Sequence, residues 1–264
     1  MAKLVLGNNA LEGAALDLAR AQVALFREKA DETKGPQTFV HRLLEQQRKQ
    51  PDSITNRELE THAFGNITAG ADTTAIAMRT ILFNVAKDRD VYAALCHEIR
   101  DEAKLTLPVS FHSVNTLPYL NAVIQEALRI HPPNGVMYPR TVPAQGATIC
   151  DKYIPPGTEI GISPWVLHYD PELFPEPDRF DPARWLTEDA ELLARRKRSI
   201  FAFSAGSHTC LGKNLSQMEM TKLVASLLVR YDVRLENPEA ELTYKVRWFT
   251  PQNGLVVKLE KREI

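Results

Sequence analysis

The stretch FSAGSHTCLG, residues 203–212, holds a cysteine well placed for metal or nucleophilic chemistry. Cys210 is one of three cysteines in 264 residues. It directly precedes residues 211–231, whose apolar spacing predicts a helix. Unpaired N–H groups and the macrodipole at a helix N-terminus stabilise a thiolate by roughly 0.3–1 kcal/mol, and the thiolate is the form that binds metals or attacks electrophiles. Gly206 and Gly212 would leave room for a broad, flat group against the loop. Position alone favours a buried structural cysteine, because free cysteines are commonly buried.

A second motif, AGADTT at residues 69–74, could handle protons. Thr73 can donate its hydroxyl to the carbonyl of Ala69 four residues earlier, and Gly70 weakens the same turn, so the helix would loosen there. The opened groove could hold an oxygen molecule and a water, with Asp72 and Thr73 as an acid and an alcohol for proton delivery. Alternatively, Asp72 caps a new helix that begins at Thr73. The residues leave both interpretations open.

A charge pair stands in the sequence EALR. Glu126 and Arg129 are three residues apart on one predicted helix, and the pattern alone favours a solvated ion pair worth roughly 0.2–0.5 kcal/mol.

Together these motifs resemble the cytochrome P-450 family of haem-thiolate monooxygenases. Residues 203–212 read F-x-x-G-x-H-x-C-x-G, which is similar to the family's cysteine loop. AGADTT looks like its distal-helix motif, EALR like its E-x-x-R pair, and DPARW, residues 181–185, like its P-x-R-W segment. The four motifs occur in family order, and the resemblance extends from about residue 38 to the end of the chain.

The resemblance implies that Cys210 is the proximal thiolate ligand of a haem b iron, with Phe203 shielding the sulfur. A thiolate pushes electron density onto the iron and favours O–O cleavage. His208 and Arg140 would lie near the two haem propionates. The remaining cofactor-binding positions that it implies are Gly206, Gly212, Ala69 and Gly70.

The resemblance also implies a buried network of Glu126, Arg129 and Arg184, which holds the cysteine loop against the core. Breaking such a network could cost roughly 3–5 kcal/mol. It further implies a largely apolar substrate pocket, lined by Phe64, Val136, Met137, Phe249 and Thr250.

The function expected from the resemblance is insertion of one oxygen atom from O2 into a small lipophilic substrate. Electrons would come from an NADPH-dependent flavoprotein reductase. The residues of the motifs resemble those of fungal microsomal members. A full-length member would face the cytosol on the endoplasmic reticulum membrane. The alternatives are a haem-thiolate isomerase or dehydratase, which would not need the relay of Asp72 and Thr73, and a truncated, haem-free fragment without turnover. A cysteine-nucleophile enzyme is disfavoured, because His208 lies only two residues from the thiol on a tight loop.

Bulk composition is that of a soluble globular protein, with 44% apolar and 25% charged residues. The formal net charge of −1 gives no global attraction to nucleic acid or membranes. An odd, widely spaced set of cysteines argues against a disulfide framework, and the sequence has no transmembrane run. The run RRKR, residues 195–198, is interpreted as a solvated charge run that, with Lys213, could face an acidic redox partner.

The elements that must position these residues are mainly helical, with small sheets in the second half. We expect one partial P-450 domain over residues 1–264, without the N-terminal part of the family fold and with exposed apolar surface where that part would pack. Helices are predicted at residues 9–32, 38–50, 53–88, 90–104, 119–131 and 211–231. Strands are predicted at 231–236, 244–249 and 254–260, and on both sides of a Pro156–Gly157 turn within 148–163. The apolar face predicted for the last helix comprises Leu215, Met218, Leu223, Leu227 and Leu228.

Overall fold

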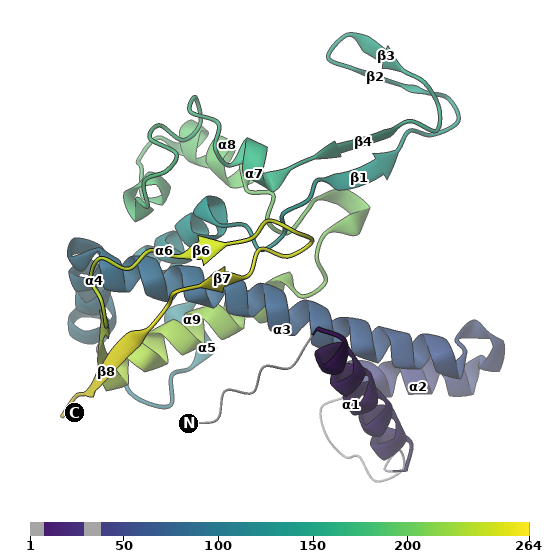
Figure 1. Cartoon of the computed structure of the whole chain (residues 1–264), viewed down its shortest axis with the longest axis horizontal. Helices are drawn as coiled ribbons and strands as arrows, with labels where there is room; N and C mark the ends of the chain where they lie inside the picture. The colour runs from purple at the N-terminus through teal and green to yellow at the C-terminus, as the bar shows by residue number, and fades with distance from the viewer. Residues whose placement is uncertain (1–7, 29–37, 264) are drawn as a thin grey trace. The chain divides into compact units, whose positions relative to one another are not determined.

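The computed structural model describes residues 8–28 and 38–263 (Figure 1). The chain divides into two compact units, Met1–Asp72 and Thr73–Ile264. The long helix α3 (Asn56–Lys87) runs through the boundary between them.

The first unit is helical. It contains α1 (Asn8–Glu28), α2 (Phe39–Lys49), a 3-10 turn (Pro51–Ser53) and the start of α3. Its core consists of Ala19, Val23, Leu44, Ile54, Leu59 and Ala63. A capping box begins α3: the Glu58 N–H donates to Thr55 Oγ1 at 3.2 Å, and the Thr55 N–H donates to the Glu58 carboxylate at 2.8 Å. The predicted end of the first helix beyond Glu28 lies outside the described residues.

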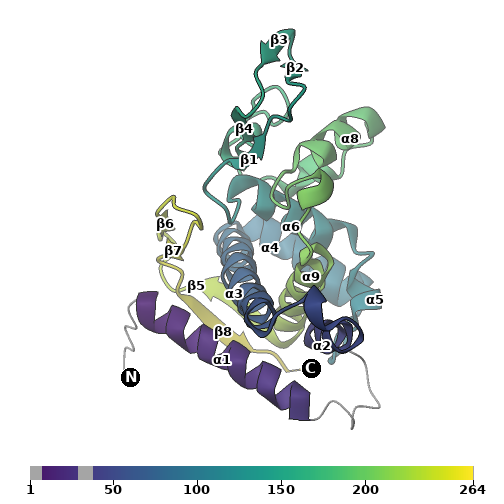
Figure 2. The same cartoon turned by 90° about the vertical axis from the view of Figure 1, so that its right-hand side faces the viewer.

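Over residues 73–263, the second unit is a helical core with four two-stranded antiparallel sheets. Its helices after α3 are α4 (Arg89–Cys96), which continues as a π-helix (His97–Glu102), α5 (Phe111–Val114), α6 (Pro118–Ile130), α7 (Pro164–Leu167), a 3-10 turn (Pro182–Trp185), α8 (Ala190–Ser199), a 3-10 turn (Gly206–His208) and α9 (Lys213–Arg230). The helices α4, α6 and α9 lie close together (Figure 2). Their buried side chains share one apolar core with the second half of α3.

Some of the paired strands are close together in the sequence, and others are far apart. The paired strands are β1 (Tyr138–Thr141) with β4 (Glu159–Ile162), β2 (Ala147–Ile149) with β3 (Lys152–Ile154), β5 (Tyr231–Leu235) with β8 (Val257–Lys261), and β6 (Thr243–Tyr244) with β7 (Gln252–Asn253). Of the predicted strand at 244–249, only Tyr244 is in a strand.

The strands predicted on both sides of the Pro156–Gly157 turn are present as β3 and β4. That turn exists, with Gly157 at φ 77°, but the strands on its two sides, β3 and β4, pair with different partners. The hairpin turn is Cys150–Asp151, at φ 48° and 61°, and two consecutive positive φ values give the turn that matches strand twist. The β2–β3 hairpin extends beyond the β1–β4 pair (Figure 1).

The face of α9 that packs against the core also differs from the prediction. Leu215 and Leu223 are 55% and 43% exposed. The buried positions are Met220, Thr221, Val224, Ala225, Leu228 and Val229. Apolar residues occur on both sides of this helix, and the buried side also includes the small side chains of Thr221 and Ala225.

Candidate functional site

The cysteine loop is closed by a backbone hydrogen bond. The Cys210 N–H donates to the Phe203 carbonyl at 2.9 Å, and the Lys213 N–H at the start of α9 donates to the Cys210 carbonyl at 3.4 Å. Ser204 and Gly206 have φ values of 57° and 67°, which turn the chain back on itself. The loop therefore holds the thiol just before the N-terminus of α9, where Cys210 is exposed.

Aromatic side chains support the loop from one side. Phe203 packs against the core of the second unit, and the Lys213 ammonium lies 5.8 Å from its ring centroid. Tyr138 of β1 donates to the Ala202 carbonyl at 3.4 Å. Burial, and secondarily the charge of Cys210, raise the pKa of Tyr138 to about 12, so this phenol stays neutral beside the loop.

Two basic groups accompany the loop. Arg140 of β1 donates through Nη2 to Ser204 Oγ at 3.2 Å, so its guanidinium lies against the loop. His208 is exposed within the 3-10 turn. Both are thus available to an anionic group bound near the cysteine.

The Glu126 carboxylate is the centre of a buried network. Arg129 donates to it through Nε at 2.9 Å and Nη2 at 2.8 Å, and Arg184 donates through Nε at 3.3 Å. Glu126 and Arg129 are 0% exposed and Arg184 is 7% exposed. The solvated pair that the spacing alone favours is therefore wrong, and the three-residue network that the resemblance implies is present.

Two further donors complete this network and were missed by the sequence analysis. The indole N–H of Trp185 donates to Glu126 Oε2 at 2.9 Å, and the Asp181 N–H donates to Oε1 at 3.0 Å. A tryptophan next to the arginine of the DPARW segment was the available signal, since a buried indole N–H needs an acceptor. With five donated hydrogen bonds, the buried carboxylate is fully satisfied.

Comparison with known proteins shows which family the chain belongs to. The family model described as Cytochrome P450 matches residues 10–259. The chain belongs to the cytochrome P450 family. It is 40% identical over 235 residues to a cytochrome P450 monooxygenase of Aspergillus terreus, covering 86% of this chain and 48% of that protein. It is 39% identical over 242 residues to the monooxygenase mpaDE of Penicillium roqueforti, covering 89% and 28%. With cicH of Emericella nidulans it shares 36% over 254 residues, covering 93% and 50%. The chain thus spans half or less of the length of these relatives.

Cytochromes P450 carry a haem whose iron is bound by a cysteine thiolate, and the residues here fit that group. No group of three or more His, Cys, Asp or Glu side chains within residues 8–28 and 38–263 could hold a metal ion. A Cβ at Gly206 would meet nothing within 4 Å, and one at Gly212 would meet only Cys210 Sγ, at 3.8 Å. Leu211 is 93% exposed beside the thiol, which gives an apolar macrocycle a surface to contact.

The segment AGADTT, which resembles the family's distal motif, lies within an unbroken helix. Because α3 continues through residues 69–74, the interpretation of Asp72 as the cap of a new helix is wrong. Ala69, Gly70 and Asp72 are exposed on the part of α3 in the first unit, and Thr73 is half-buried on the part in the second.

Two segments predicted to line the P450 substrate pocket are joined to each other. Asn134 and Phe249 form an antiparallel bridge. A Cβ at Gly135 would lie 2.3 Å from the Arg247 carbonyl oxygen, so the close approach of these segments requires glycine. Val136 is half-buried and Met137 is 48% exposed.

The structure contradicts the prediction that Thr250 lines the substrate pocket. This residue is 0% exposed, and its hydroxyl donates to the Pro132 carbonyl at 2.9 Å. It therefore ties the loop to the end of α6 and does not line a pocket. Phe64, on the first unit's part of α3, packs against the core of that unit.

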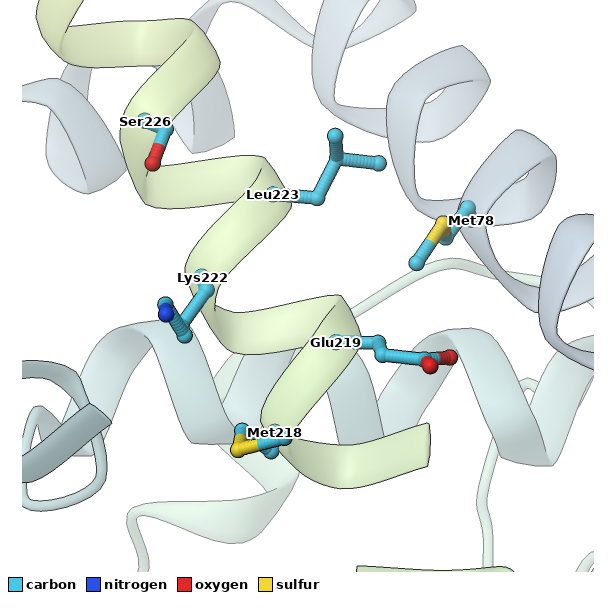
Figure 3. Close-up of a pocket in the computed structure, with 6 residues that line it drawn as sticks. All are labelled: Met78, Met218, Glu219, Lys222, Leu223 and Ser226. Carbon is cyan, nitrogen blue, oxygen red and sulfur yellow. The ribbon is translucent and has the colours of Figure 1, made fainter. Parts of the chain in front are cut away.

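A separate hollow of about 420 Å³ lies between α3 and α9 (Figure 3). Leu223 of α9 and Met78 of α3 point toward each other across it. Its lining includes none of the predicted site residues. The full lining is Met78, Met218, Glu219, Lys222, Leu223 and Ser226.

The basic run of residues 195–198 belongs to α8, a helix that the sequence analysis did not predict. Arg196 is 8% exposed and donates to the carbonyls of Leu173 at 3.0 Å and Arg184 at 2.8 Å, so the interpretation as a fully solvated run is wrong. Arg195, Lys197 and Arg198 are exposed. Among residues 8–28 and 38–263, no helix has the length and apolarity needed to span a bilayer.

Proposed function

We propose that this chain carries the haem-binding half of a monooxygenase site, with Cys210 as the thiolate ligand of the iron. The single observation that carries the proposal is an exposed cysteine at the N-terminus of α9, whose backbone N–H donates to the Phe203 carbonyl and whose loop has open space at Gly206 and Gly212. When bound, the haem supplies the activation of O2 that protein side chains cannot supply.

The chain's own residues would bind and orient this group. The N-terminus of α9 stabilises the thiolate charge. Phe203 shields the sulfur, and backbone N–H groups after Cys210 tune it. Arg140 and His208 are the basic side chains that would bind the two propionates.

On the distal side, we assign proton delivery to Asp72 and Thr73. The carboxylate would exchange protons with solvent from its exposed position on α3, and the Thr73 hydroxyl would pass them to the reacting oxygen. A side chain in this role contributes typically about 100- to 10,000-fold to the rate. An isomerase or dehydratase working on a peroxide would not need such a pair.

Electrons would come from an NADPH-dependent flavoprotein reductase. Arg195, Lys197 and Arg198, together with Lys213, are exposed cations that would attract an acidic partner surface. A small lipophilic substrate fits the apolar positions Val136, Met137 and Phe249. A full-length member would lie on the cytosolic face of the endoplasmic reticulum membrane.

Isotopic labelling tests this function. The chain loaded with haem, a fungal reductase and NADPH would be incubated under labelled O2 with a panel of lipophilic compounds. We expect products that carry one labelled oxygen atom, with the other recovered in water. Turnover without label would support an isomerase or dehydratase, and a chain that binds no haem would support the haem-free fragment.

A further inference from the structure

We propose that His168 is a positioning residue that fixes the cysteine loop to the Glu126 network. The inference rests on the proposed function, because it concerns how the loop that carries Cys210 is held. It assigns a role to a buried histidine that belongs to none of the motifs above.

The hydrogen bonds of His168 define its tautomer. The side chain is 0% exposed at the end of α7. The Phe201 N–H donates to Nε2 at 2.8 Å, so Nε2 must carry the lone pair. The proton is then on Nδ1, which lies 3.1 Å from the Arg129 carbonyl and donates to it.

The backbone of His168 makes a second connection to the network. Arg129 Nη1 donates to the His168 carbonyl at 3.1 Å, while the same guanidinium binds Glu126. Arg129 and His168 therefore hold each other through two hydrogen bonds of opposite direction. The position of the imidazole is set by the buried carboxylate network.

The backbone of Phe201 connects the imidazole of His168 to the cysteine loop. Its carbonyl accepts the Ser204 N–H at 3.0 Å, and this turn leads into Phe203, whose carbonyl accepts the Cys210 N–H at 2.9 Å. The Phe201 N–H is half-buried, and His168 supplies its acceptor at the point where the chain leaves α8 and enters the loop.

The imidazole can serve as an acceptor because it stays neutral. Burial, opposed by the hydrogen bond to the Arg129 carbonyl and reinforced by the Arg129 charge, lowers the pKa of His168 to about 4. At neutral pH Nε2 therefore only accepts a hydrogen bond, and Nδ1 only donates one.

Two amide replacements test the two hydrogen bonds of the His168 side chain one at a time. In His168→Gln the amide lies where Nε2 lies, so its oxygen can accept the Phe201 N–H. The side-chain bond to the Arg129 carbonyl is lost, but the bond from Arg129 Nη1 to the backbone carbonyl of residue 168 remains and keeps this residue tied to the network. In His168→Asn the amide lies nearer Nδ1, so it can donate to Arg129 but cannot reach Phe201. Each variant loses one hydrogen bond, and a purely structural role predicts equal effects. Tyr169→Phe is the control, because it removes the neighbouring bond from the Tyr169 hydroxyl to the Ile130 carbonyl, 2.7 Å, and leaves Phe201 untouched.

The test has one readout without haem and one with it. In the haem-free chain, we expect amide exchange at Phe201 to accelerate about tenfold in His168→Asn and to change little in His168→Gln or Tyr169→Phe. After haem loading, the share of reduced carbon monoxide complex with the red-shifted, thiolate-type Soret band should fall in His168→Asn alone. Equal effects of the two amides would overturn the inference.

A measurement on the unaltered chain covers the case in which a variant does not fold. Nitrogen-15 NMR should show His168 as the Nδ1–H tautomer at neutral pH, and an Nε2–H tautomer would overturn the inference. If the unaltered chain binds no haem, the proposed function fails, while the exchange and tautomer results still decide the role of His168.

Discussion

At the scale of single residues, Thr73 is the position that separates oxygen chemistry from haem binding. Replacing Thr73 by Ala removes the hydroxyl assigned to proton delivery and leaves the cysteine loop unchanged. We expect the thiolate-type carbon monoxide band to persist, while most of the NADPH consumed yields peroxide in place of oxygenated product. The ratio of product to NADPH measures this.

Thr61→Ala is the matched control. Thr61 lies on the same helix, is exposed, and donates its hydroxyl to the Arg57 carbonyl at 2.8 Å, so its loss should leave coupling unchanged. Intact coupling in Thr73→Ala would show that the relay is assigned wrongly.

Trp185 allows a second prediction at this scale. Trp185→Phe keeps the aromatic packing against Phe174 but removes the N–H that Glu126 accepts. Because the acceptor is a buried charge, we expect a loss of about 1.5–3 kcal/mol in the free energy of unfolding, measured by urea titration. Trp248→Phe, at a 64% exposed position, should change it by less than about 0.5 kcal/mol. Equal losses in the two variants would remove Trp185 from the network.

At the scale of elements, the buried side of α9 can be tested directly. Leu228 is 1% exposed and Leu223 is 43% exposed. Leu228→Ala should cost about 2–5 kcal/mol, because it leaves a cavity in the core, and Leu223→Ala should cost clearly less. Urea titration of both variants gives the comparison. A larger loss for Leu223 would favour the face that the sequence analysis predicted.

Local signals explain which elements could be predicted. Thr38 and Thr55 cap α2 and α3, and Pro118 begins α6, so these starts were predictable within a few residues. The Cys150–Asp151 turn carries no Gly or Asn, so its hairpin gave no turn signature. Helix α8 has too many charged residues for an apolar stripe to be visible.

The candidate site likewise contains residues that could be predicted from the sequence and residues that could not. The cysteine loop was predictable because its residues are contiguous. The burial of Glu126 was not predictable from spacing, because its partners Arg184 and Trp185 lie 58 and 59 residues away; only the resemblance to the family indicated it. His168 lies in a proline-rich stretch without periodicity, and its partners Arg129 and Phe201 are 39 and 33 residues distant.

At the scale of the whole molecule, buried histidines make stability depend on pH. The pKa of His168 is lowered to about 4, and burial also lowers that of His131. The unfolded chain therefore binds more protons than the folded chain as pH falls from about 6.5 to about 4, and stability is lost across that window. For His168 alone the loss is roughly 3 kcal/mol. Burial raises the pKa of Glu98, which acts in the opposite direction just above the normal carboxylate range.

The free energy of unfolding measured at several pH values between 7 and 4 checks this prediction. His168→Gln should show a shallower decline than the unaltered chain, because one of the titrating groups is gone. An unchanged slope would mean that His168 does not titrate as its burial requires.

The central claim is the bond between the sulfur of Cys210 and the haem iron. Its most direct test is the absorption spectrum of the haem-loaded chain after reduction and exposure to carbon monoxide. We expect a strongly red-shifted Soret band in the unaltered chain and in Cys150→Ser, whose cysteine is also exposed, and no such band in Cys210→Ser. A band that survives in Cys210→Ser, or one that never appears although haem is bound, would contradict the account.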